Sequence, residues 1–142
     1  QQGSVGAAPC HLSVDATGRV VLAANYTGGS VVTFPVQPDG SLGPRAAFIQ
    51  HTGSSVNPAR QKEPHAHSVN LSPDNRFAFV ADLGLDRILV YRLDSKTGSL
   101  TPNDPAAATV APGSGPRHFA FAPDGTRAFV INEMLSTLTS FT

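Results

Sequence analysis

The chain has 142 residues, the length of one ordinary domain, and its ten basic and ten acidic residues cancel to a net charge of zero. Only 14% of the residues are charged, against roughly 25% in an average soluble domain, which excludes a surface-wide field that attracts nucleic acid or anionic membrane. The single cysteine, Cys10, has no disulfide partner within the chain.

The sequence predicts neither a signal peptide nor a membrane-spanning segment. The chain has no apolar run long enough to span a bilayer, and residues 1–9 lack the basic and apolar regions of a signal peptide. The sequence therefore predicts no membrane contact. It leaves the cellular location open and favours the cytoplasm.

Short strands are predicted along the whole chain, because thirteen glycines and twelve prolines divide it into short apolar runs. Three segments align without gaps: "CHLSVDATGRVVLAAN" at residues 10–25, "HSVNLSPDNRFAFVAD" at 67–82 and "RHFAFAPDGTRAFVIN" at 117–132. Each predicts a strand, a tight turn and a second strand, with the turns at residues 16–18, 73–75 and 123–125.

A third strand is predicted in each copy, at residues 30–36, 87–94 and 136–142. The turn-rich segments "QPDGSLGP" and "SKTGSLTP" then lead to a fourth strand, at residues 46–50 in the first copy and 106–110 in the second. The third copy stops before its fourth strand.

Four antiparallel strands that recur about every 50 residues are typical of a β-propeller blade. We therefore predict an all-β propeller: a connection at 1–9, one blade at 10–66, a second at 67–116 and a truncated third at 117–142. Closed propellers have about four to eight blades, so just under three form a partial arc with apolar end faces. We expect the remaining blades of a larger propeller, or self-association, to close the ring.

The repeat also places polar residues at one mouth of the central channel. Successive antiparallel strands reverse direction, so the start of the first strand and the end of the second lie on the same rim. The residues at these positions differ between copies while the strands around them barely change. The residues at these rim positions are Cys10, His67 and Arg117 at the starts of the first strands, and Tyr26, Leu83 and Glu133 after the second strands. This variation indicates either a binding site or a solvated rim.

The runs "PCHLSVDATGRVVLAANYTGGSVVTFPV", "PHAHSVNLSPDNRFAFVADLGLDRILVYRLD" and "GPRHFAFAPDGTRAFVINE" together resemble the seven-bladed propeller lactonase family. This family includes the propeller type of 6-phosphogluconolactonase and the fungal carboxy-cis,cis-muconate cyclase. The resemblance implies seven blades and hydrolysis of a small anionic sugar-acid lactone, foremost 6-phosphogluconolactone, without a cofactor. The alternatives are a muconate-type lactonising cycloisomerase and a propeller that binds a ligand or protein without catalysis.

The resemblance also implies catalytic residues. In the cyclase a histidine, an arginine after proline and a glutamate are proposed to form the active site, and His67, Arg117 and Glu133 occupy those motif positions here. Arginine is a permanent bidentate donor for negative charge, and histidine can accept a proton near neutral pH. Glutamate can hold the histidine or share the acid–base work. The structural alternatives are an Arg117–Glu133 ion pair and a hydrogen bond from His67 to a backbone carbonyl.

Further residues at the mouth are candidates for substrate binding. The long segment 51–64 carries Arg60, and it either closes over an anionic substrate or is an ordinary exposed loop. Cys10 is interpreted as a small thiol that is buried or lines the channel. The two histidines of "EPHAHS" are a poor metal signal without further ligands, so no metal is predicted. The substrate-binding candidates are Arg60, His65, Cys10 and His118.

Overall fold

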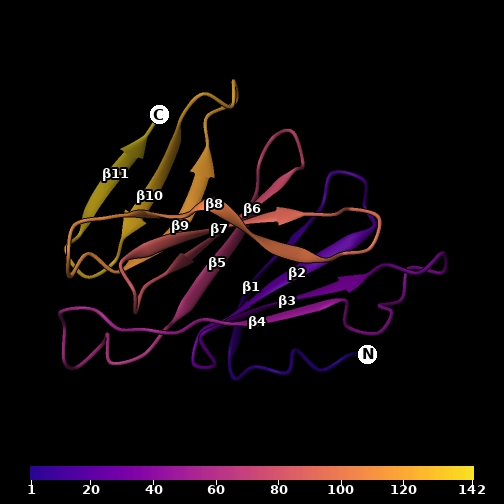
Figure 1. Cartoon of the computed structure of the whole chain (residues 1–142), viewed down its shortest axis with the longest axis horizontal. Coiled ribbons are helices and arrows are strands. Elements are labelled where there is room, and N and C mark those ends of the chain that lie inside the picture. The colour runs from indigo at the N-terminus through magenta and orange to yellow at the C-terminus, as the bar shows by residue number, and fades with distance from the viewer.

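The computed structural model describes residues 1–142 and contains eleven strands and no helix. The strands form three antiparallel sheets, visible as three bundles of arrows in Figure 1. The first sheet has the order β1 (Pro9–Val14), β2 (Val20–Asn25), β3 (Ser30–Pro35) and β4 (Ala47–Gln50). The second has β5 (Ala66–Leu71), β6 (Phe77–Asp82), β7 (Arg87–Leu93) and β8 (Leu100–Thr109). The third has β9 (Pro116–Phe121), β10 (Ala128–Asn132) and β11 (Thr137–Phe141).

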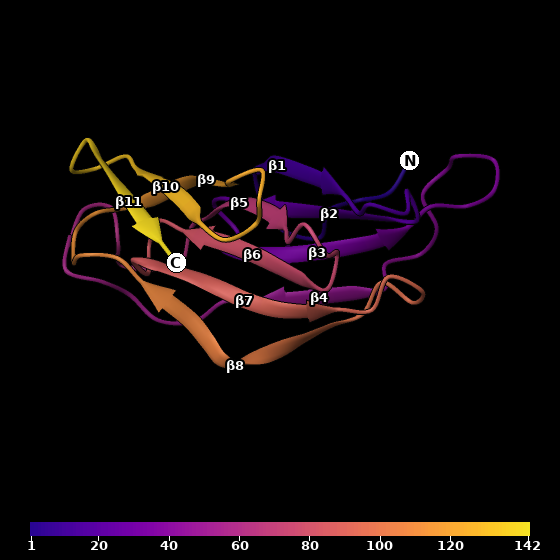
Figure 2. The same ribbon diagram turned by 90° about the horizontal axis from the view of Figure 1, so that it is seen from above.

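This arrangement is a partial β-propeller, as predicted. Each sheet follows the chain order from strand to strand, which is the meander of a propeller blade. Strand β5 packs against β1 of the first sheet and against β9 of the third, so these three first strands are the innermost strands. Figure 2 shows their labels along one side of the molecule, with β8 on the opposite side.

The tight turns between first and second strands have the predicted chemistry. Gly18, Asn75 and Gly125 all adopt a positive φ, of 70°, 61° and 70° respectively. Glycine and asparagine enter this left-handed region at low steric cost, which explains why these residues end the three turns. The matching conformation in three copies confirms that the repeat is structural.

The fourth strand of the second sheet differs from its prediction. Strand β8 begins at Leu100, although residues 100–102 were predicted to belong to a turn-rich segment and only residues 106–110 to a strand. Pro102 and Pro105 lie within it. Proline is tolerated here because β8 is an edge strand with only β7 as its neighbour, so the missing N–H groups break no second ladder.

Apolar side chains fill both spaces between the sheets. The first interface is aliphatic, with Leu22 and Val31 from the first sheet packed in one cluster with Val69 and Val80 from the second. The second interface is aromatic: Phe79 stacks on Phe119 with ring centroids 5.4 Å apart, and Phe121 meets both rings edge-on.

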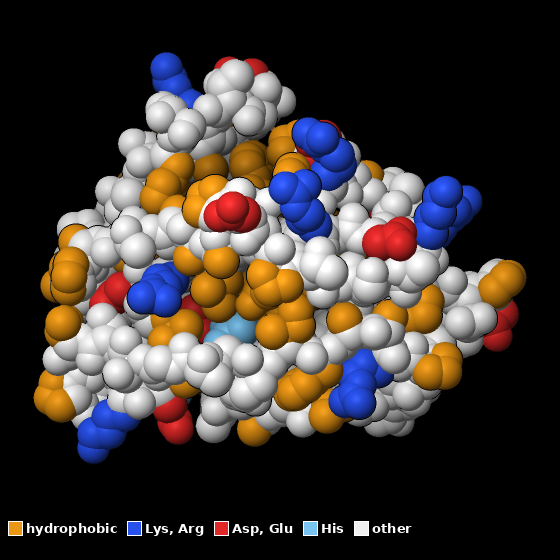
Figure 3. Space-filling model, in the orientation of Figure 1, with side chains coloured by type: hydrophobic (Ala, Val, Ile, Leu, Met, Phe, Trp, Pro, Cys, Tyr) orange, Lys and Arg blue, Asp and Glu red, His pale blue; other side chains and the backbone are white.

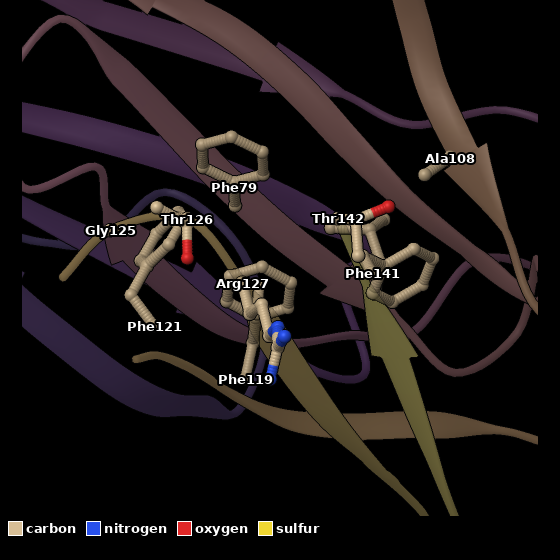
Figure 4. A pocket seen from close by; sticks show the side chains of 11 residues that line it. Phe79, Ala108, Phe119, Phe121, Gly125, Thr126, Arg127, Phe141 and Thr142 are labelled. Atoms are coloured by element: carbon tan, nitrogen blue, oxygen red, sulfur yellow. The ribbon is translucent and has the colours of Figure 1, made fainter. Parts of the chain in front are cut away.

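An apolar cavity of about 280 Å³ lies in the second interface, beside these rings and the β9–β10 turn (Figure 4). It is at the rim opposite the predicted mouth, because that turn and the end of β10 lie at opposite ends of the sheet. The cavity therefore belongs to the packing between blades.

The two outer faces of the arc expose large apolar side chains. Leu12 and Val14 on β1 are 63% and 52% exposed, and Leu138 on β11 is 75% exposed. Phe129 and Ile131 on β10 are also exposed. Apolar end faces were predicted for an arc of blades, since each blade normally covers its neighbour.

Charged side chains of both signs are interspersed on the face shown in Figure 3, in keeping with the zero net charge. No helix of the structure has the length and apolar character required to cross a bilayer.

Asp15 stabilises the first turn through hydrogen bonds and connects this turn to the second sheet. The carboxylate accepts hydrogen bonds from Thr17 N and Oγ1, Arg19 N and Val20 N, and from Asn75 Nδ2 of the neighbouring sheet at 3.0 Å. Burial works against its charge, but the hydrogen bonds outweigh burial and lower the pKa of Asp15 to about 2.

Replacing Asp15 with alanine is expected to lower the free energy of unfolding by about 1–3 kcal/mol, because the buried Val20 N–H and several partly buried donors lose their acceptor. The stabilisation is present above the ordinary pKa of 3.8 and is lost as the pH falls towards about 2. Urea unfolding at pH 7 and pH 3 measures both effects. Asp39→Ala is the control, because exposed Asp39 bonds only Ser41 in its own turn. Equal stability of the two variants at pH 7 would contradict this role.

Candidate active site at the channel mouth

The innermost strands of the first two blades are joined by side-chain hydrogen bonds. Cys10 Sγ lies 3.3 Å from His67 O, and Ser13 Oγ donates to Val69 O at 2.6 Å. Val69 N in turn donates to His11 Nδ1 at 3.3 Å. These bonds keep β1 and β5 in register, so repeat-equivalent positions lie side by side at the mouth.

An ion-pair network crosses the mouth from the first interblade loop to the third blade. Glu133, directly after β10, pairs through Oε2 with Arg117 Nε and through Oε1 with Arg60 Nη2, each at 2.9 Å. Burial opposes its charge, but the hydrogen bond from Arg60 and the charges of both arginines outweigh burial and lower the pKa of Glu133. Glu133 is therefore ionised near neutral pH, and its carboxylate contacts arginines rather than holding His67.

Arg60 reaches this network because the segment 51–64 is a folded loop. Gln61 is fully buried, and its side chain donates to Leu83 O at 2.9 Å and accepts from Asn57 N at 3.0 Å. Asn57 Oδ1 accepts from Arg60 N at 3.0 Å. The prediction that Leu83 faces the mouth is wrong: its side chain is fully buried, and the loop bonds its carbonyl.

Tyr26 brings the two histidines of "EPHAHS" together. Its ring stacks on the His65 ring at 4.7 Å and meets the His67 ring edge-on at 5.2 Å. His65 Nδ1 lies 3.2 Å from Tyr26 O, and because a carbonyl only accepts, this nitrogen carries the proton. Nowhere in the structure do three or more His, Cys, Asp or Glu side chains come together as metal ligands do.

His67 is shielded from solvent, with 9% exposure, and its Nδ1 is buried without a hydrogen-bond partner. Burial lowers the pKa of His67 and outweighs a hydrogen bond to the backbone of the same residue, which raises it, and the positive charge of Arg117 lowers the pKa further. The imidazole is thus neutral near pH 7, the form that accepts a proton.

Two other candidates line the channel beside His67. Cys10 is exposed rather than buried, although its sulfur lies against backbone carbonyls of β2 and β5. Partial desolvation raises the pKa of the Cys10 thiol, so the sulfur stays protonated and is a poor nucleophile. The exposed His118 ring lies 5.5 Å from the His67 ring and 5.9 Å from the His11 ring. The repeat had placed Tyr26 at the mouth, but neither Tyr26 nor His11 was among the predicted site residues, although His11 and His118 share one repeat position.

Comparisons with known proteins agree with this architecture. The family described as "Lactonase, 7-bladed beta-propeller" matches residues 1–142, so the chain belongs to this family. The 6-phosphogluconolactonase of Bacillus subtilis is 42% identical over 129 residues, which are 91% of this chain and 36% of that protein.

Solved structures agree as well. A candidate 6-phosphogluconolactonase from Bacteroides fragilis superposes with a TM-score of 0.93 at 39% identity, over 99% of this chain and 40% of that one. The periplasmic gluconolactonase of Pseudomonas aeruginosa gives a TM-score of 0.81 at 36% identity, over 94% of this chain and 41% of that one. The chain thus spans less than half the length of the relatives it matches.

Replacing Arg117 with glutamine is expected to raise the pKa of His67. The substitution removes a positive charge that lowers this pKa and leaves the negative charge of Glu133 less compensated, and both effects favour the imidazolium. NMR titration of the imidazole signals measures the shift. Arg76→Gln is the control, because Arg76 pairs with Asp74 at the opposite rim. An unchanged or lower pKa in Arg117→Gln would contradict the electrostatic account.

Proposed function

We propose that the complete propeller to which this chain belongs hydrolyses a sugar-acid lactone, with 6-phosphogluconolactone as the substrate. The observation that carries the proposal is a neutral, shielded imidazole beside a guanidinium at one mouth of the channel: His67 from the second blade and Arg117 from the third. Membership of the lactonase family and the names of its relatives support the reaction class.

In this scheme His67 is the general base. It accepts a proton from a water molecule, whose oxygen then forms a bond to the lactone carbonyl carbon. The tetrahedral intermediate collapses, the bond from that carbon to the ring oxygen breaks, and the imidazolium of His67 returns the proton to the leaving oxygen. The product is the open-chain hydroxy acid. A lowered pKa suits this role, since the base is then free at and below neutral pH.

Arg117 stabilises the negative charge that develops on the carbonyl oxygen. Its Nε is engaged by Glu133, which leaves the two terminal nitrogens of the guanidinium for the substrate. Glu133 acts as a positioning residue, since its ionised carboxylate fixes the plane of this guanidinium. The scheme needs no covalent nucleophile, in keeping with the protonated Cys10 thiol.

Replacing either His67 or Arg117 with alanine in the complete protein is expected to lower kcat/KM for 6-phosphogluconolactone by about a hundredfold or more, the usual effect of losing a general base or an oxyanion donor. The rate of acid release, corrected for spontaneous hydrolysis, measures this loss. Arg76→Ala serves as the control at the opposite rim. Wild-type turnover in both variants would overturn the site assignment, and turnover of carboxymuconate alone would replace lactonase with cyclase.

A further inference from the structure

We propose that Arg60 and the hydroxyl of Tyr26 form a second binding subsite, which takes a phosphate group at the far end of the lactone from Arg117. The inference rests on the proposed function and deepens it, because it assigns the residues that would distinguish a phosphorylated lactone from an unphosphorylated one. The relatives leave this point open, since both a 6-phosphogluconolactonase and a gluconolactonase are among them.

The donors of this subsite are in place and only partly used. Arg60 Nη2 lies 3.1 Å from Tyr26 Oη and 2.9 Å from Glu133 Oε1, whereas its Nε and Nη1 have no partner. The Arg60 side chain is 47% exposed, so its free N–H groups are open to a ligand. Tyr26 Oη accepts from Arg60, which leaves the phenolic proton available for donation.

Both donors are held by their surroundings. The buried Gln61 anchors the loop that carries Arg60, and the stacked His65 ring fixes the plane of Tyr26. The hydrogen bonds that Arg60 donates to Tyr26 and Glu133 raise the pKa of Arg60, so its charge is permanent. A preorganised cation and hydroxyl bind an anion without first having to be ordered.

Glu133 sets the distance between the two ends of the site. Its carboxylate contacts Arg60 through one oxygen and Arg117 through the other, so two guanidinium groups are held near one another with one net positive charge. In the proposed binding mode, a lactone whose carbonyl lies at Arg117 extends its other end towards Arg60, because both guanidinium groups are held by the same carboxylate. A planar guanidinium with free N–H groups and an adjacent hydroxyl matches the oxygens of a phosphate monoester. An unphosphorylated lactone leaves these donors unpaired.

Two product acids that differ only in the phosphate test the subsite. Calorimetric titration of the complete protein with 6-phosphogluconate and with gluconate is expected to show at least tenfold tighter binding of the phosphorylated acid, weakening as salt is added. Equal affinity for the two acids, or binding of neither, overturns the subsite.

Single-residue variants test whether Arg60 and Tyr26 provide the extra affinity for the phosphorylated acid. Arg60→Gln is expected to weaken 6-phosphogluconate binding by about tenfold or more and to leave gluconate binding unchanged, because a charge-assisted hydrogen bond is lost. Tyr26→Phe keeps the ring against both histidines, and loss of the hydroxyl is expected to weaken binding about threefold to tenfold. The matched control is Lys62→Gln, which removes the same charge from an exposed residue of the same loop. Equal weakening in Arg60→Gln and Lys62→Gln would show a diffuse charge effect and overturn the proposal.

The binding readout separates this inference from the proposed function. A protein that discriminates the two acids through Arg60 but does not hydrolyse the lactone keeps the subsite and loses the activity. A protein that hydrolyses both lactones equally well, with Arg60→Gln as active as the wild type, keeps the activity and loses the subsite.

Discussion

The site depends on the lateral packing of the innermost strands. Because β1, β5 and β9 stand side by side, residues that are about 50 positions apart in the chain meet at one mouth. The bond from Ser13 to Val69 and the contact of Cys10 with His67 fix this packing in the first two blades, and stacked phenylalanines fix it between the second and third. A rigid frame of this kind holds the imidazole of His67 and the guanidinium of Arg117 in place on separate blades, since each residue lies on its own sheet.

The ion-pair network adds a connection between parts of the chain that share no sheet. The side chain of Arg60 extends from the loop after the first blade and pairs with Glu133 of the third blade. The loop therefore passes over the second blade and buries Leu83 beneath it. Two guanidinium groups keep the carboxylate of Glu133 ionised, so in the proposed scheme it positions Arg117 and transfers no proton. In the proposed scheme acid–base work belongs to His67, whose neutral form is favoured by burial and by the positive charge of Arg117.

Much of the fold was predictable because the turn chemistry repeats: residues 16–18, 73–75 and 123–125 each end in a residue that tolerates positive φ. The repeat also predicted that Glu133 and Arg117 lie on one rim, and they form an ion pair there. The sequences of the loops and edge strands do not repeat from copy to copy in this way. The contact of Arg60 with Glu133, the stacking of Tyr26 on His65 and the early start of β8 at Leu100 depend on tertiary packing, so the alignment of the repeats could not reveal them. The hypothesis that His67, Arg117 and Glu133 carry the chemistry came from the family resemblance and not from the repeat.

The central claim is that one mouth of the propeller binds the lactone between His67 and Arg117 at one end and Arg60 at the other. A crystal structure of the complete protein with bound 6-phosphogluconate tests it most directly. The account predicts the carboxylate of the acid beside His67 and Arg117, and the phosphate within hydrogen-bonding distance of Arg60 and the Tyr26 hydroxyl. Binding of the acid at the opposite rim, or in the reverse orientation with its phosphate on Arg117, would contradict it.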